Sequence, residues 1–348
     1  MSLYLFFLLK IKITNIILMA KSFKKFVILF IIFFICIEHK NYKIFKKIKH
    51  ELYHIIKKRI KYIDSLYIIG CLKFGNFIIC LNNAIILCEF FRCKRIIIQS
   101  NKNIFINNNI FYQKYNLTIE PNHTFIHNYN SLEIDLYYFF FQFNFKHLGN
   151  VNRFHIFREE ILNNLPKIKV HPNDLYIYIR GGDIFKVTIT EFPTYAQPPL
   201  CFYENVLNKF KFREIRIISE DKLNPNLILL EKFYHIKHIK NNIKIDISYL
   251  ANSYNIILAI SSFIASIIKL NNNLRFAWEY DFYKLSERYY HLHYSVYTFP
   301  FKYTIYNMKA SKNYKKLMFP FINSEKQRKI MIEEKCDNKF YIIPPRIS

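Results

Sequence analysis

Glycine is scarce in this chain, with only 5 residues among 348. Glycine permits positive φ angles and a close approach of the backbone to a ligand. Because glycine is so scarce, a glycine at the end of a predicted strand or helix is informative. Gly75 comes just before a predicted helix, and Gly181 and Gly182 follow directly after a predicted strand. We expect these three positions to meet a conformational or binding requirement.

Acidic residues are also few, with 25 Asp and Glu against 51 Lys and Arg, which gives a net charge of +26. Such an excess ordinarily suggests nucleic acid or an anionic membrane surface as a partner. The lysines are scattered through Ile-, Asn-, Phe- and Tyr-rich sequence, however, and no arginine-dense stripe or nucleic-acid-binding motif is present. The charge therefore favours anionic ligands in general, and we do not expect nucleic acid among the partners.

Residue spacings typical of metal sites are missing as well. His291-x-His293 and His235-x-x-His238 are histidine pairs, but neither has a Cys or acidic partner at a ligand spacing. We interpret these histidines as solvated or core residues and expect no metal ion and no cofactor. The 7 cysteines decide neither the redox compartment nor a disulfide pairing.

The N-terminus carries apolar runs with basic flanks. The run from Phe26 to Ile37 follows three lysines and is short for a membrane-spanning helix. An earlier apolar stretch, Met1 to Ala20, is interrupted by two lysines. Residues 1–37 are therefore predicted as a signal anchor or signal peptide. Residues 38–63 are Lys-rich with apolar residues at helical spacing, which predicts a basic stem helix.

Two features disagree about the side of the membrane on which the remaining chain would lie. The lysines that follow the apolar run would keep the C-terminal side cytosolic by the positive-inside rule. Two N-glycosylation sequons, Asn116-Leu-Thr118 and Asn122-His-Thr124, would instead be modified in the secretory pathway. These patterns alone leave the topology open.

Beyond the stem, apolar strand-like and helix-like segments alternate, which predicts an α/β fold with doubly wound parallel sheets. The expected division is an N-terminal α/β half over residues 64–165, a C-terminal α/β half over residues 166–300 and a basic C-terminal extension over residues 301–348. The following list gives the elements that we expect: strands at 65–70, 94–99, 136–145, 175–179, 214–219 and 255–260, and helices at 77–91, 154–165, 203–210, 226–234, 246–254 and 264–270.

The strand over residues 175–179 runs directly into Arg180-Gly-Gly-Asp183. In an open α/β sheet, ligands bind at the carboxyl ends of strands, where this arginine falls. A guanidinium offers a bidentate fork to phosphate oxygens, and the glycines would let backbone N–H groups approach them. The alternative is a Gly-Gly turn in which Arg180 and Asp183 form a surface ion pair.

The same segment carries a family resemblance. Tyr178-x-Arg180-x-Gly182-Asp183 resembles the H-x-R-x-G-D motif of the α1,2-, α1,6- and protein O-fucosyltransferase superfamily, with Tyr178 in the place of the histidine. The resemblance implies that Arg180 holds the diphosphate of GDP-fucose. It also implies a GT-B-like arrangement, in which two Rossmann-like half-domains face a cleft. Asp183 is the carboxylate of the motif and either acts as general base or orders the loop, and Glu220 and Asp221 are alternative bases.

Two further segments resemble motifs of this superfamily, in the same order along the chain. Gly75-Asn76 with the downstream Ala84 resembles a G-N motif near the start of the catalytic domain. Asp246-x-x-x-Leu250, followed by Ser261-Ser262-Phe263, resembles a D-x-x-x-[LM] and S-[ST]-F pair. Asn76 and the two serines are alternatively ordinary helix caps. The resemblance predicts that the nucleotide sugar is bound by the following residues: Gly75, Asn76, Tyr178, Arg180, Gly182, Asp246, Ser261, Ser262 and Phe263.

These motifs predict a glycosyltransferase that moves a sugar, fucose by the resemblance, from a nucleotide sugar to a hydroxyl of a glycan or protein. No two aspartates stand at i and i+2, the D-x-D pair of metal-dependent transferases, so Arg180 would neutralise the diphosphate without a metal. The predicted location is a single-pass type II protein of the Golgi or endoplasmic reticulum membrane, with a luminal catalytic domain. The alternatives are a membrane-tethered sugar-binding protein without turnover and a basic nucleic-acid-binding protein.

Overall fold

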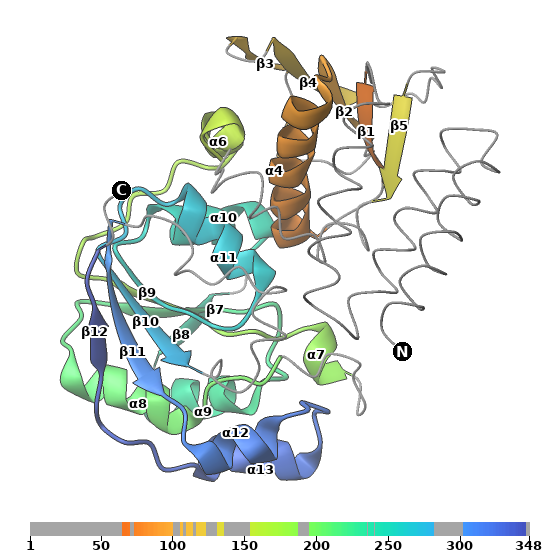
Figure 1. The fold of residues 1–348 in the computed structure, drawn as a ribbon. Helices are drawn as coiled ribbons and strands as arrows, with labels where there is room; N and C mark the ends of the chain where they lie inside the picture. The colour runs from red at the N-terminus through yellow and green to blue at the C-terminus, as the bar shows by residue number, and fades with distance from the viewer. Residues whose placement is uncertain are drawn as a thin grey trace, which may run out of the picture.

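The computed structural model of the chain contains two β-sheets with helices packed between and around them (Figure 1). The residues that the structure describes are 65–69, 73–99, 105–106, 109–113, 116–122, 131–135, 154–186, 195–234, 236–239, 241–281 and 302–345. The predicted signal segment and stem, and the strand expected at 136–145, lie outside these ranges. No helix within the described residues is long and apolar enough to cross a membrane.

The first sheet has five strands in the order β3-β4-β2-β1-β5, all parallel except β3. Their bounds are Ser65–Ile69 for β1, Arg95–Gln99 for β2, Ile110–Tyr112 for β3, Leu117–Asn122 for β4 and Ser131–Asp135 for β5. Strand β1 lies between β2 and the edge strand β5. The chain first places β2 on one side of β1 and later returns to place β5 on the other side. The carboxyl end of β1 is therefore a topological switch point.

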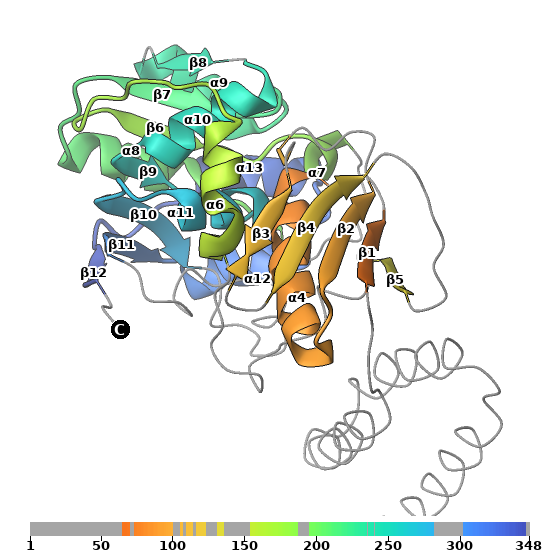
Figure 2. The same ribbon diagram turned by 90° about the horizontal axis from the view of Figure 1, so that it is seen from above.

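The long helix α4, Phe74–Phe91, connects β1 to β2 and covers one face of the first sheet. Most of its side chains are apolar, because it is covered on two sides. Ile78, Leu81 and Ile85 are fully buried, and on the side away from the sheet α4 packs against a helix of the second sheet (Figure 2). The expected β-α-β unit is confirmed, with the helix starting three residues earlier than predicted.

The second sheet has seven strands in the order β12-β11-β10-β9-β6-β7-β8, all parallel except β12. Their bounds are Leu175–Tyr178 for β6, Ile215–Ile218 for β7, Lys237–Ile239 for β8, Asn255–Ile257 for β9, Phe276–Asp281 for β10, Thr304–Lys309 for β11 and Tyr341–Ile343 for β12. The chain adds β7 and β8 on one side of β6 and then crosses back to place β9 on the other. The carboxyl ends of β6 and β9 therefore form the switch point of this sheet, where open α/β sheets bind their ligands.

Helices cover both faces of the second sheet, as the doubly wound prediction required. Along β6 the side chains alternate between the two cores: Leu175 and Ile177 belong to one, Tyr176 and Tyr178 to the other. The bounds of the helices are Phe154–Asn163 for α6, Asp183–Lys186 for α7, Leu200–Lys209 for α8, Pro225–Tyr234 for α9, Ile243–Asn252 for α10, Ser262–Leu270 for α11, Lys312–Met318 for α12 and Glu325–Glu333 for α13. Helices α10 and α11 face the first sheet, whereas α8, α9, α12 and α13 lie on the opposite side (Figure 1).

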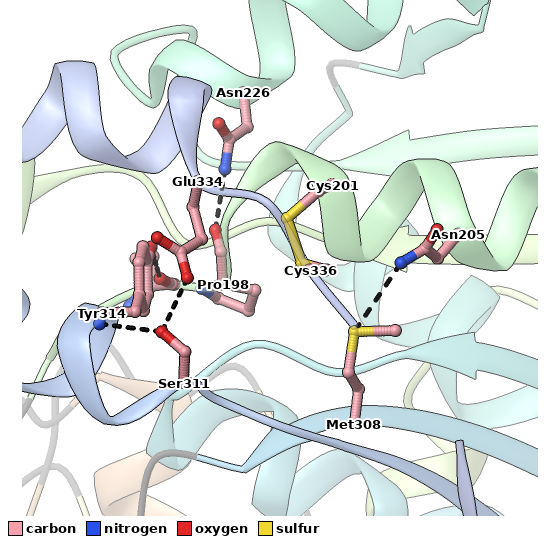
Figure 3. The surroundings of a disulfide bond; sticks show 10 residues. Pro198, Cys201, Asn205, Asn226, Met308, Ser311, Tyr314, Glu334 and Cys336 are labelled. Atoms are coloured by element: carbon pink, nitrogen blue, oxygen red, sulfur yellow. Dashed lines mark hydrogen bonds between the residues drawn. A yellow bond between two sulfur atoms is a disulfide. The ribbon is translucent and has the colours of Figure 1, made fainter. Parts of the chain in front are cut away.

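The C-terminal residues are part of this sheet rather than an extension beyond residue 300. Strand β11 pairs with β10 over six residues and buries Ile305 and Met308, and Tyr314 of α12 is fully buried. A disulfide between Cys201 of α8 and Cys336 fastens the segment to the rest of the domain (Figure 3). The predicted boundary missed this because most basic residues of the segment are exposed, although Lys315 is buried, while its apolar residues recur at strand and helix spacing and enter the core.

Candidate functional site

Arg180 lies at the carboxyl end of β6 with its side chain almost entirely buried, at 8% relative exposure. Its two terminal nitrogens each donate to a carboxylate: Nη2 to Asp183 Oδ1 at 2.5 Å and Nη1 to Glu220 Oε1 at 3.1 Å. Burial by itself lowers the pKa of Arg180, but the neighbouring Tyr178 hydroxyl and the two carboxylates raise it above its ordinary value. The guanidinium is therefore a permanent, well-ordered cation at the switch point.

The two glycines after Arg180 make room for the loop that carries Glu220 and Asp221. Gly182 has φ +68°, and a Cβ there would lie 1.7 Å from Glu220 Oε2, while a Cβ on Gly181 would lie 2.6 Å from Asp221 Oδ1. The N–H of Gly182 donates to Asp221 Oδ2 at 3.1 Å. The two glycines thus allow the end of β6 to pack against the loop that follows β7. The Gly182 N–H, which we expected to approach a ligand, is hydrogen-bonded to the Asp221 side chain.

Tyr178 and Ser261 connect the ends of β6 and β9. The Tyr178 side chain is buried, and its hydroxyl lies 3.5 Å from Ser261 Oγ. Ser261 is the N-cap of α11, and its hydroxyl accepts from the N–H of Phe263 at 3.1 Å. The Phe263 ring packs on the Tyr178 ring with centroids 5.2 Å apart. The prediction that Ser261 is a helix N-cap is therefore confirmed. Tyr178 packs against the start of α11 through its ring and its hydroxyl.

The start of α4 brings the first sheet to the same place. Gly75 packs so closely on the start of α11 that a Cβ would lie 2.5 Å from the backbone nitrogen of Phe263. The Gly75 carbonyl accepts from Ser266 Oγ at 3.1 Å, and Phe74 contacts the Phe263 ring with centroids 5.9 Å apart. Because only glycine permits this approach, close packing between the two halves explains why a glycine stands at position 75.

Lys73 is the site residue that sequence reasoning missed. It occupies the N-cap position of α4, at the switch point of the first sheet, and makes no capping hydrogen bond through its side chain. Its Nζ instead lies 3.0 Å from Asp183 Oδ2, so the carboxylate stands between Lys73 and Arg180. The available signal was a lysine directly before Phe74-Gly75-Asn76, at the end of a predicted strand.

The structure thus joins the two switch points at one junction, formed by the start of α4 on one side and the ends of β6 and β9 on the other. Three segments that are far apart in the sequence meet there: residues 73–76, 178–183 and 261–263. The carboxylates of the 220–221 loop complete the group. Ser262 lies half-buried in the first turn of α11, and Asn76 lies in the first turn of α4 rather than at its cap.

Asp246, a predicted site residue, is hydrogen-bonded to Asn241 and not to the Arg180 cluster. It lies in the first turn of α10, and its Oδ1 accepts from Asn241 Nδ2 at 3.3 Å. Burial raises the pKa of Asp246 to about 6, partly offset by the Asn241 hydrogen bond. Its carboxyl therefore titrates closer to neutral pH than an ordinary aspartate. Its hydrogen bond to Asn241 does not connect it to Arg180.

The protonation of Asp183 limits what it can do chemically. Burial raises its pKa, but the charges of Arg180 and Lys73 and their hydrogen bonds outweigh this, so that the pKa of Asp183 lies below its ordinary value. A carboxylate with a lowered pKa is a weak proton acceptor at neutral pH. Its observed role is to pair with both cations. Among the described residues, no group of three or more potential metal ligands comes together.

No family model, no curated protein and no solved structure matches the chain.

Proposed function

We propose that this chain is a glycosyltransferase that takes its sugar from a nucleoside diphosphate donor, GDP-fucose by the motif resemblance, and that the diphosphate binds at the junction of the two sheets. The observation that carries the proposal is the placement of two cations, Arg180 and Lys73, on opposite sides of one carboxylate, where both topological switch points meet. The arrangement supports a GT-B-like donor site, in which the carboxyl ends of strands from both halves face a common ligand.

In this proposal the diphosphate takes the position between the two cations that Asp183 occupies in the structure. Asp183 is 43% exposed and can move aside, and Lys73, 64% exposed, can adjust to the diphosphate, whereas Arg180 is held in place by the strand end. As the sugar leaves, negative charge grows on the diphosphate, and a buried guanidinium stabilises it without a metal ion. The acceptor hydroxyl would give its proton to a carboxylate of the neighbouring loop, Glu220 or Asp221.

Substitution of the two cations tests the proposal. Charge-assisted hydrogen bonds contribute roughly 1.5–3 kcal/mol each, so losing two at Arg180 should reduce the transfer rate by about 100-fold or more. Arg180→Lys should not restore it, because a lysine cannot reproduce the bidentate fork. Lys73→Ala should weaken nucleoside diphosphate affinity, by roughly tenfold for one such bond. Because Lys73 forms an exposed ion pair, the melting temperature should hardly change.

The measurements are GDP affinity, sugar-nucleotide turnover with released diphosphate as readout, and melting temperature of the full-length protein. Lys312→Ala is the matched control, since it removes an exposed lysine from α12 on the far side of the second sheet. Unchanged GDP affinity in both Arg180 variants would remove the basis of the proposal and leave Arg180 as the structural partner of Asp183 and Glu220.

One observation favours a second candidate, a sugar-nucleotide-binding protein without turnover. Both terminal nitrogens of Arg180 are already bound to carboxylates, and the residue in the motif's histidine position is a buried tyrosine. Such a protein would bind GDP or GDP-fucose, and Arg180→Ala would abolish that binding. No diphosphate would be released with any acceptor, which separates it from the transferase.

The proposed location is the lumen of the secretory pathway, with residues 1–37 as the membrane anchor of a type II protein and a glycan or protein as acceptor. A structural disulfide such as Cys201–Cys336 persists in oxidising compartments. Asn116 of the first sequon is exposed in a turn before β4, where an oligosaccharide can be attached. Both observations support the luminal side over the cytosolic one.

A further inference from the structure

We infer that Arg328 of α13 is a positioning residue for the donor site, through the short helix α7 that carries Asp183. The expected effect on GDP affinity rests on the proposed function, whereas the contacts of Arg328 do not. Arg328 is 143 residues from Phe185 in sequence, yet its Nη2 donates to the carbonyl oxygen of Phe185 at 2.9 Å. Phe185 is two residues after the carboxylate that stands between Lys73 and Arg180.

Helix α7 has little of its own to hold it in place. It has only four residues. The Ile184 N–H donates to Asp183 Oδ1 at 3.0 Å, and the Phe185 N–H donates to the Gly182 carbonyl at 3.2 Å. A single turn is marginal by itself in water, so contacts from outside must fix its position. The angle at which Asp183 faces the two cations depends on those contacts.

The contacts come from the C-terminal segment. The Arg328 guanidinium lies over the Phe185 ring, 5.6 Å from its centroid, in addition to its bond to the Phe185 carbonyl. Phe321 packs edge-on against the same ring, with centroids 5.7 Å apart. The Nε of Arg328 donates to Asn323 Oδ1 at 2.9 Å, which orients the guanidinium plane. Backbone, ring and guanidinium are therefore fixed together at the end of α7.

The segment that presents Arg328 is itself firmly anchored. The side chain of Gln327, the preceding residue, donates to the carbonyls of Leu317 and Pro320 and accepts from the N–H of Ile322. Beyond the end of α13, the Cys201–Cys336 disulfide ties the chain to α8 (Figure 3). A rigid donor on an anchored helix is what a positioning residue requires.

The test compares Arg328→Ala, Arg328→Lys and the control Lys329→Ala in the full-length protein. Lys329 is the next residue of α13, its side chain is 72% exposed, and its substitution removes the same charge without touching α7. Hydrogen exchange is measured at the amides of residues 184–186 and of the buried strand β6. GDP affinity and melting temperature are measured on the same samples.

We expect the α7 amides to exchange roughly tenfold faster or more in Arg328→Ala, because one charge-assisted hydrogen bond and a ring contact are lost. Exchange in β6 should stay near the wild-type rate. GDP should bind several-fold more tightly, because a loosened Asp183 competes less well with the diphosphate for Arg180 and Lys73. Arg328→Lys retains the charge but cannot serve Phe185 and Asn323 together, so its α7 amides should also exchange faster. If Arg328→Ala does not fold, Arg328→Lys alone decides.

Two results would overturn the inference. One is exchange at α7 that is no faster than in Lys329→Ala, or that rises equally in β6, as expected for a general loss of stability. The other is selective loosening of α7 with unchanged GDP affinity. A wild-type protein that binds neither GDP nor GDP-fucose would instead contradict the proposed function, and the exchange data would still show whether Arg328 holds α7.

Discussion

At the scale of single residues, the buried charge of Arg180 is balanced by two carboxylates, Asp183 and Glu220. A buried cation is tolerated when its partners are well placed, and removing one partner leaves an unpaired buried charge. Asp183 and Glu220 supply that compensation, and Lys73 balances Asp183 from the other half. An anionic ligand would exchange one negative partner for another. The charged cluster is therefore compatible with a donor site, and the same geometry explains why Arg180 is ordered in the free protein.

Asp246 gives a pH-dependent prediction at the same scale. Its pKa is about 6 in the folded protein, raised by burial from an ordinary value of 3.8. The folded state thus binds more protons than the unfolded state between these values, and stability falls as the pH rises through this window. Above pH 6 the folded protein carries a buried charge. Asp246→Asn removes it and should raise the free energy of unfolding at pH 7.5 by roughly 1–3 kcal/mol.

Urea unfolding of both proteins at pH 7.5 and pH 4 measures this effect. Near pH 4 the difference between variant and wild type should largely vanish, because Asp246 is then protonated in the fold. An Asp246→Asn protein that is less stable at pH 7.5 would show that the charge is stabilised by a contact other than Asn241. If the resemblance is right about Asp246, the same variant should bind GDP more weakly although it is more stable.

At the scale of elements, the contact between α4 and α11 determines how the halves meet. Gly75 in the first turn of α4 lies directly on the backbone of Ser262 and Phe263. Helix propensity alone predicts that Gly75→Ala stabilises the protein by about 1 kcal/mol. Packing predicts the opposite, since a Cβ cannot be accommodated against backbone atoms and overpacking costs about 1–3 kcal/mol.

We expect packing to dominate, so that Gly75→Ala lowers the melting temperature and separates α4 from α11. The displacement should also move Lys73, two residues away, from Asp183 and reduce GDP affinity. Thermal unfolding and GDP titration of the variant check both effects. A higher melting temperature with unchanged affinity would mean that the two helices are not in close contact.

At the scale of the whole molecule, the Cys201–Cys336 disulfide links the C-terminal segment to α8 beside the second sheet. It joins residues 135 apart and holds the C-terminal strands and helices on the sheet (Figure 3). Cross-links of this kind typically stabilise by about 2–4 kcal/mol. We expect Cys201→Ser, Cys336→Ser and the double variant to be destabilised by similar amounts, because each loses the same bond.

Urea unfolding with and without reductant measures the effect, and a mobility shift on non-reducing gels reports the bond itself. Wild-type protein in reductant should match the variants, and reductant should not affect the double variant. Wild-type stability that is insensitive to reductant would contradict a structural disulfide, and with it the support that the bond lends to an oxidising compartment.

The sequence by itself determined the strands and helices that carry the motifs, and the positions of the motifs within them. Apolar segments predicted five of the twelve described strands and six of the nine described helices, because side-chain periodicity is a local property. It also placed Arg180 and Ser261 at strand ends, since each directly follows an apolar strand. The scarce glycines marked Gly75 and Gly182 correctly as special, although the reason proved to be packing and a positive φ.

Only the tertiary structure decided which of these strand ends meet. Strand order depends on crossovers between distant segments, and therefore local patterns did not reveal that β6 and β9 flank a switch point facing the end of β1. Lys73 and Asp183 are 110 residues apart and Arg328 and Phe185 are 143 apart, so no spacing in the chain indicated their contacts. The same long-range packing drew residues 304–343 into the sheet, because β11 and β12 gain their hydrogen bonds only beside β10 and each other.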